Sequence, residues 1–316
     1  MKMSAVMEKR SRVTVISCNL CDHNDFRVLL EHKLLIGPLL RCSNCGLVCV
    51  DISRSHELIQ DSQGQEEREK AYAKETKLAQ EKLFFRPDLE YAERLNRKAN
   101  FEARVLMING EWNRPTEHAR LLEVGCGEGL FLEQARLHGY AVTGVEPNET
   151  SAAFAREVLG LHVFAKTLAE ATISQDCIDI GVLLHVIEHL PDPNRAVSEM
   201  NKILRKGGLL VIETPNIDSF PFQILRKKWR QFIPVHYYFF SKKTIVALLE
   251  KNGFKVSRIV DIGNRVSVRF FLNRLERLSP KSAFLLNRLA RSLKFEEKTF
   301  YMNPLDLMFV FARKTD

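Results

Sequence analysis

Leu121-Leu122-Glu123-Val124-Gly125-Cys126-Gly127-Glu128-Gly129 is the most informative stretch of the sequence. In it, an apolar strand pattern runs directly into a glycine-rich turn, and this junction indicates the fold class. A helical pattern begins at Leu130, immediately after the turn. Glycines let the backbone approach a ligand closely, and the start of a helix presents free N–H groups. Strand, turn and helix therefore predict a cradle for a nucleotide-like ligand.

Short apolar strands alternate with helical patterns around this loop. We expect strands at 120–124, 141–146, 178–184, 209–214, 254–260 and 307–312, and helices at 131–138, 150–159 and 195–204. Strands that alternate with helices indicate an α/β fold, in which helices cover both faces of a mostly parallel sheet.

Glu146 is the expected partner of the glycine loop, because it ends the next strand at the distance where a carboxylate binds ribose hydroxyls. A dinucleotide fingerprint would have glycine where this chain has Leu130. The acidic neighbours Glu123 and Glu128 suit a pyrophosphate poorly and favour a cofactor with an amino group and a sulfonium. The alternatives are a solvated strand-end carboxylate for Glu146 and a dehydrogenase for the whole chain.

Four of the seven cysteines form two C-x2-C pairs separated by 20 residues, namely Cys18, Cys21, Cys42 and Cys45. In an intracellular chain this spacing predicts a structural zinc ribbon, because two knuckle turns complete a tetrahedron of thiolates. Apolar runs at 28–30 and 47–50 are expected to form strands that hold the knuckles. The remaining cysteines sit in apolar contexts and are expected in the core.

With the motifs taken in order from Leu121 to Asn216, the chain resembles the class I S-adenosylmethionine-dependent methyltransferases. The matching motifs are the glycine loop, Val145-Glu146-Pro147, Ala169-Glu170 with Asp176-Cys177-Ile178-Asp179-Ile180, His185-Val186-Ile187-Glu188-His189-Leu190-Pro191-Asp192-Pro193, and Leu204-Arg205-Lys206-Gly207-Gly208-Leu209-Leu210. The most similar subgroup is methyltransferase-23-like, with ubiquinone and glycan methyltransferases, and begins with a ribbon ending Arg-Cys-x-x-Cys-Gly-Leu, as 41–47 do here.

The resemblance implies a seven-stranded Rossmann-like sheet and a set of cofactor contacts. Glu123 and the loop would hold the methionine moiety, Glu146 the ribose, and Leu168 and Ala169 the adenine, while His185 would face donor and acceptor. The implied cofactor-binding set is Glu123, Gly125, Cys126, Gly127, Gly129, Glu146, Pro147, Leu168, Ala169 and His185.

Two histidines are the candidate catalytic residues if the acceptor is a hydroxyl. His185 and His236 could act as a general base near neutral pH. His236 lies in an aromatic segment that could line an acceptor pocket, and an ordinary packed histidine is the equal alternative. His185-x-x-Glu188-His189 also fits an inverted zinc-peptidase pattern, but it follows a strand and precedes two prolines, so the helix that this site needs is missing.

Charge divides the chain unevenly. The segment from Phe220 to Asp316 has 20 Lys or Arg against 7 Asp or Glu, whereas the rest has 27 against 32. A basic third points to an anionic partner, such as a phosphorylated substrate, a membrane surface or nucleic acid, or it is simply a solvated face. No stretch approaches the ~18 apolar residues of a membrane span, so we expect a cytoplasmic protein, with contact at the inner face of a membrane left open.

The expected organisation has four parts: a zinc ribbon at 1–55, a helical connector or lid at 56–115, the cofactor-binding core at 116–263, and a basic helical insertion with the last strand at 264–316. In the insertion, Leu285, Leu289 and Leu293 recur at helical spacing beside basic residues, which suits core packing, a membrane surface or an acceptor lid.

The combined prediction is S-adenosylmethionine-dependent methylation, on oxygen, of a small-molecule, glycan or lipid-linked acceptor, with structural zinc in the ribbon. The alternatives are an RNA methyltransferase that grips phosphates with the ribbon and the basic face, and a methyltransferase-like adaptor without activity.

Overall fold

A computed structural model describes residues 17–35, 37–51, 90–275, 286, 288–293 and 295–315. Most of the helical connector expected at 56–115 lies outside these residues, as do the first part and the end of the ribbon expected at 1–55. Leu285, one of the three periodic leucines of the insertion, also lies outside them.

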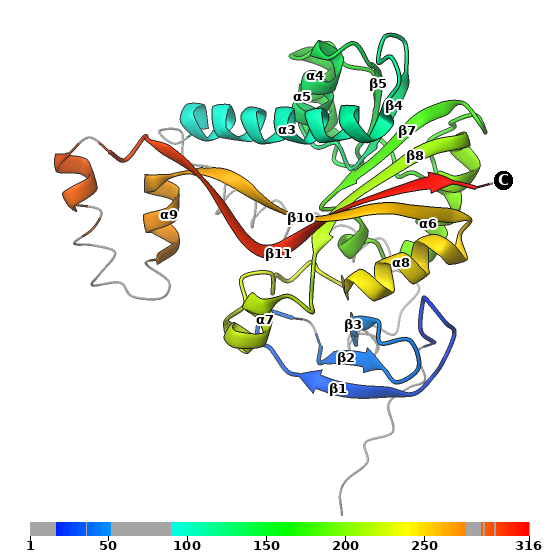
Figure 1. Cartoon of the computed structure of the whole chain (residues 1–316), viewed down its shortest axis with the longest axis horizontal. Helices are drawn as coiled ribbons and strands as arrows, with labels where there is room; N and C mark the ends of the chain where they lie inside the picture. The colour runs from blue at the N-terminus through cyan, green and yellow to red at the C-terminus, as the bar shows by residue number, and fades with distance from the viewer. Residues whose placement is uncertain are drawn as a thin grey trace, which may run out of the picture.

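A seven-stranded sheet forms the centre of the molecule, in the order β10-β11-β8-β7-β4-β5-β6 (Figure 1). Its strands are β4 (Arg120–Val124), β5 (Ala141–Val145), β6 (Val163–Phe164), β7 (Ile178–Leu184), β8 (Leu204–Pro215), β10 (Phe254–Ser267) and β11 (Thr299–Lys314). The five strands from β6 to β8 are parallel, and β11 pairs antiparallel with both β8 and β10. All seven residues of β7 are buried, as expected for a central strand covered on both faces. The predicted α/β class is confirmed.

Helices cover both faces of the sheet, as a doubly wound fold requires (Figure 1). They are α3 (Glu90–Trp112), α4 (Leu130–Leu137), α5 (Glu149–Glu157), α6 (Pro193–Ile203), α7 (Phe220–Leu225), α8 (Lys242–Lys251) and α9 (Val268–Leu275), with single 3-10 turns at Ile187–His189 and Arg226–Lys228. One buried cluster joins α3, α4 and α5 to the sheet, and another joins α6 and α8. Asn148 and Asp192 cap α5 and α6 through their side chains.

The ribbon is a second, four-stranded sheet, in the order β1-β2-β3-β9. Its strands are β1 (Phe26–Leu30), β2 (Leu39–Cys42), β3 (Val48–Val50) and β9 (Tyr238–Phe239). The last of these comes from the core segment that precedes α8, so the ribbon and the core share a sheet through β3 and β9.

The last two strands extend beyond the sheet as a two-stranded arm. The sequence pattern ends the sixth strand at Val260, but β10 continues to Ser267 and pairs with β11 from Thr299 onward. Gly263 permits the continuation, because a Cβ there would lie 2.1 Å from the Met302 carbonyl oxygen. The start of the insertion expected at 264 therefore falls inside a strand.

Candidate cofactor and methyl-transfer site

Three glycines shape the turn after β4. Gly125, Gly127 and Gly129 have φ values of 69°, 52° and 77°, in the left-handed region that favours glycine. A side chain at Gly125 would meet Val186 at 2.5 Å, and one at Gly129 would meet Leu161 at 2.6 Å. The turn is therefore tight, and α4 starts directly after it at Leu130.

Glu146 closes this turn from the end of β5. Its Oε2 accepts a hydrogen bond from the Gly127 N–H and its Oε1 accepts one from the Asn148 N–H, both at 2.8 Å. Burial raises the pKa of Glu146, and these backbone hydrogen bonds oppose the rise. Each carboxylate oxygen keeps a further lone pair, so the side chain could also accept from ribose hydroxyls.

Glu123 gives a test of whether the site fits S-adenosylmethionine. Its side chain is 3% exposed, and its Oε2 has no hydrogen-bond partner among the described residues. Burial and then the charge of Glu146 raise the pKa of Glu123 well above its ordinary value. A buried carboxyl without a partner is costly, and an ammonium group would satisfy it. The residues present therefore fit an amino-acid cofactor with a ribose.

The other expected cofactor contacts lie near the same edge. Cys126 is buried in the turn, and Pro147 is exposed directly after Glu146. Leu168 is half-buried and Ala169 is exposed, both in the turn that follows β6. Because these positions all follow the carboxyl ends of parallel strands, they lie along one edge of the sheet.

His185 directly follows β7 and lies between two buried carboxylates. Its Nδ1 is 3.3 Å from Glu188 Oε1, and its Nε2 is 3.1 Å from Glu213 Oε1. The His185 side chain is 43% exposed, whereas the two carboxylates are almost fully buried. Ionised carboxylates only accept hydrogen bonds, so both ring nitrogens must donate, and the ring is an imidazolium.

The charges agree with this geometry. Burial alone would lower the pKa of His185, but the hydrogen bonds to Glu188 and Glu213 outweigh it and raise the pKa to about 10. Burial would raise the pKa of Glu213, but the charge of Arg104 and the bond from His185 lower it to about 2. A ring that keeps both protons has no lone pair for an acceptor proton, so the geometry does not support His185 as a general base.

Arg104 is a functional residue that the sequence patterns did not indicate. From α3 it donates through Nε and Nη2 to the two oxygens of Glu213, both at 3.1 Å. Its side chain is 5% exposed, and Nη2 also donates to the Gly263 carbonyl at 3.0 Å. The only signal in the sequence was Glu213, because a glutamate inside the apolar run of β8 is expected to need a buried cation as its partner.

His236, the second catalytic candidate, is 3% exposed. Burial and then the charge of His189 lower its pKa to about 3, so the ring is neutral. Its ring packs against that of His189 at 4.7 Å between centroids. An acceptor could not reach this ring without movement, and the packed alternative fits the described structure better.

Glu188, His189 and His236 bring one potential metal-ligand atom each within 4.8 Å of one another. Existing hydrogen bonds already account for much of the group: Glu188 Oε2 accepts from Thr214 at 3.0 Å, and His189 Nδ1 pairs with the Val235 carbonyl at 2.8 Å. The residues around them form a single 3-10 turn, so the helical arrangement of the peptidase pattern is not present here.

The four ribbon cysteines converge. Their sulfurs lie within 4.8 Å of one another, with Cys18 and Cys45 at 3.5 Å and Cys21 and Cys42 at 3.6 Å. A tetrahedral zinc with bonds of about 2.3 Å separates its sulfurs by roughly 3.8 Å. The donor set and its spacing fit a structural zinc ion.

The fold places the chain among the doubly wound α/β proteins, which bind ligands at the carboxyl ends of their strands. The model of the methyltransferase-23 family, described as a methyltransferase domain, matches residues 91–259, more than half of the 316 residues. The chain therefore belongs to this family of methyltransferases, and the resemblance noted from its motifs is confirmed.

Individual relatives match a shorter region. A ubiquinone biosynthesis O-methyltransferase of Caulobacter is 33% identical over 115 residues, which are 34% of this chain and 45% of the relative. A probable S-adenosylmethionine-dependent methyltransferase of Mycobacterium tuberculosis is 37% identical over 101 residues, which are 32% of this chain and 37% of the relative. The chain thus spans less than half the length of these two curated relatives.

Solved structures of S-adenosylmethionine-dependent methyltransferases are also similar. One from Archaeoglobus fulgidus is 22% identical with a TM-score of 0.46, covering 68% of this chain and 94% of its own. One from Mesorhizobium loti is 17% identical with a TM-score of 0.45, covering 66% and 96%.

Proposed function

We propose that the protein transfers a methyl group from S-adenosylmethionine to an oxygen of a small-molecule, glycan or lipid-linked saccharide acceptor. The observation that carries the proposal is the buried Glu123 carboxyl beside the glycine turn and Glu146, because its Oε2 has no hydrogen-bond partner in the part of the chain that the structure describes. Relatives named as O-methyltransferases support oxygen as the methylated atom.

The same residues argue against a dinucleotide cofactor. Two carboxyl groups, Glu123 and Glu146, face the turn that would have to bind a pyrophosphate. Leu130 stands where the third glycine of a dinucleotide fingerprint would be. A cofactor with a cationic amino group satisfies Glu123, whereas a pyrophosphate would be repelled.

When bound, the cofactor supplies a sulfonium whose methyl carbon undergoes in-line displacement. The chain would contribute mainly by holding the acceptor in line and excluding water. Glu123 would bind the amino group, the glycine turn the carboxylate, and Glu146 the ribose. Pro147, Leu168 and Ala169 would line the nucleoside.

His185 would border the acceptor side of the site without reacting. Both its nitrogens are engaged by Glu188 and Glu213, so it can neither remove a proton nor donate a hydrogen bond to the acceptor oxygen, and these carboxylates balance its positive charge. With no base described at the site, we infer that the acceptor hydroxyl is acidic enough to release its proton to solvent, as a phenol does, which favours a small-molecule acceptor over the much less acidic hydroxyls of a saccharide.

Zinc in the ribbon would be structural, since four thiolates leave no open coordination position. It would fix β2 and β3, and through β9 the segment that carries His236. We propose no role for zinc in the chemical step.

The experiment is transfer of labelled methyl from S-adenosylmethionine to phenols, glycans, lipid-linked saccharides and RNA. We expect labelled methyl to be incorporated into a small acceptor that bears a hydroxyl group. The methylated product should resist base hydrolysis, because a methyl ether is stable to base and a methyl ester is not. Incorporation into RNA alone would replace this acceptor class with the RNA alternative. A protein that binds the cofactor and methylates nothing in the panel would favour the adaptor.

A further inference from the structure

The arm formed by β10, β11 and the residues between them carries an unusual concentration of exposed apolar side chains. Seven of the sixteen exposed large apolar residues in the described part of the chain lie in it: Leu286, Leu289, Leu293, Phe295, Phe300, Tyr301 and Leu305, at 38–62% exposure. Figure 1 shows this ribbon leaving the sheet and carrying α9 and a second short helix away from the core. Leu286, Leu289 and Leu293 are therefore not packed into the core.

Three of the leucines share one side of the short helix. Leu286 and Leu289 lie in the helix and Leu293 in the turn that ends it, and their spacing of three and four residues puts them on the same side. Their exposed fractions are 42%, 53% and 55%. An apolar face of this kind is covered by a partner when the protein works.

The same segment is strongly basic. Residues 264–305 contain nine Lys or Arg and three Glu. Two of the glutamates lie within ion-pair distance of arginines: Glu296 and Glu297 pair with Arg269, and Glu296 also pairs with Arg291. Among the described residues, the arm therefore combines exposed leucines with four exposed cations: Arg265, Arg288, Arg291 and Lys298.

We propose that the arm lies on an anionic lipid surface, with the leucine face in the interface and the basic residues against lipid headgroups. Charge argues against a second copy of the chain as the occupant, because two arms of like sign would meet. The leucines argue against nucleic acid, which would satisfy the cations and leave the apolar face uncovered. Among the described residues, no helix is long and apolar enough to cross a bilayer, so the contact would be peripheral.

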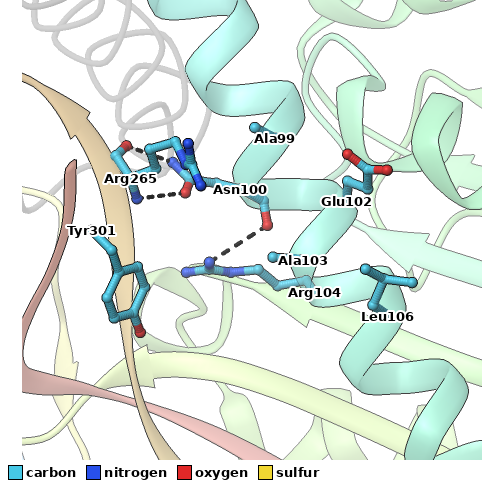
Figure 2. Close-up of a pocket in the computed structure, with 8 residues that line it drawn as sticks. All are labelled: Ala99, Asn100, Glu102, Ala103, Arg104, Leu106, Arg265 and Tyr301. Atoms are coloured by element: carbon cyan, nitrogen blue, oxygen red, sulfur yellow. Dashed lines mark hydrogen bonds between the residues drawn. The ribbon is translucent and has the colours of Figure 1, made fainter. Parts of the chain in front are cut away.

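The root of the arm is held in a defined orientation against α3. Asn100 donates from Nδ2 to the Arg265 carbonyl at 3.0 Å and accepts from the Arg265 N–H at 2.7 Å (Figure 2). Tyr301 lines the same hollow of about 230 Å³ and accepts from the Gly263 N–H at 2.8 Å. An arm fixed in this way would hold the core at a constant angle to the surface it binds.

The test is flotation of the full-length, zinc-loaded protein with vesicles of phosphatidylcholine, alone or mixed with phosphatidylglycerol. No cofactor is added, so the result does not depend on the proposed chemistry. We expect binding to the mixed vesicles only, weakened by salt. The double variant Leu289→Glu and Leu293→Glu should reduce binding about tenfold or more, because each change removes a leucine that would enter the lipid interface and adds a negative charge.

The matched control is Leu137→Glu, at a 72% exposed position on α4 of the core, which should bind as the wild type does. Melting curves of all variants should coincide, since each replaced side chain is already exposed. The proposal is overturned if the wild-type protein does not bind the mixed vesicles, or if the double variant binds them as well as the wild type does. It is also overturned by sedimentation equilibrium that shows a dimer without lipid which the double variant separates into monomers.

Discussion

At the residue scale, the cofactor site depends on a few carboxyl groups with different tasks. Glu123 is buried, and its Oε2 has no hydrogen-bond partner among the residues described. Glu146 accepts from two backbone N–H groups, and Glu213 is paired with Arg104. The first two are left able to bind a ligand, whereas the third is committed to the protein.

Glu146→Ala should weaken S-adenosylmethionine binding by about 1 to 3 kcal/mol, because charge-assisted hydrogen bonds to the ribose are lost. Calorimetric titration measures the change in Kd. Glu149→Ala is the control, since Glu149 is exposed, lies three residues further on and pairs only with Arg156 among the contacts described for its side chain. Equal affinities for the two variants would remove Glu146 from the site.

His185 should remain protonated at neutral pH. A ring with a raised pKa contributes stability that is fully present below its ordinary pKa of about 6.5 and is lost as the pH rises through about 10. Nitrogen-detected NMR of the ring should therefore show an imidazolium across neutral pH, and Glu213→Gln should move its titration back toward the ordinary value. Titration of the wild-type ring near 6.5 would restore the general-base role.

At the scale of elements, local patterns predicted well and distant pairings did not. The glycine turn, β4 and β7 fell where the sequence placed them, since burial and turn chemistry there are local. The sequence pattern began β8 at 209, but β8 starts at Leu204, because Gly207 and Gly208 resemble a turn and instead lie within the strand. The pairing of β3 with the two-residue β9 depends on residues almost 190 positions apart, which no local pattern reveals.

Loss of zinc should affect the core as well as the ribbon. Cys42→Ser should lower the zinc content and reduce the melting temperature by several degrees, because β9 pairs with the ribbon through β3. Metal analysis and calorimetry measure both quantities. Cys177→Ser, outside the ribbon, should change neither, and a full zinc content in the Cys42 variant would contradict the assignment of the ligands.

At the scale of the whole molecule, Arg104 connects three parts of the structure. It lies on α3, pairs with Glu213 of β8, and donates to Gly263 and Asn264 at the root of the arm. Because Glu213 also pairs with His185, one hydrogen-bond network links the sheet edge at His185 to the arm. Sequence patterns could not predict this link, since Arg104 and Glu213 are 109 residues apart.

Arg104→Ala should destabilise the protein by about 3 to 5 kcal/mol, because it leaves the Glu213 charge buried without its main partner. Denaturant unfolding measures the loss. Arg97→Ala is the matched control on the same helix, where a partly exposed ion pair with Glu128 at 4.0 Å predicts a change below about 1 kcal/mol. A small effect of the Arg104 change would mean that water or another cation compensates Glu213.

The cradle between β4 and β5 is the proposed binding site for S-adenosylmethionine. Calorimetric titration of the zinc-loaded protein with S-adenosylmethionine, and separately with NAD, tests it most directly. We expect micromolar binding of S-adenosylmethionine, weakened in Glu146→Ala and retained in Glu149→Ala, and no binding of NAD. Binding of NAD alone, or of neither ligand to folded protein, would contradict it.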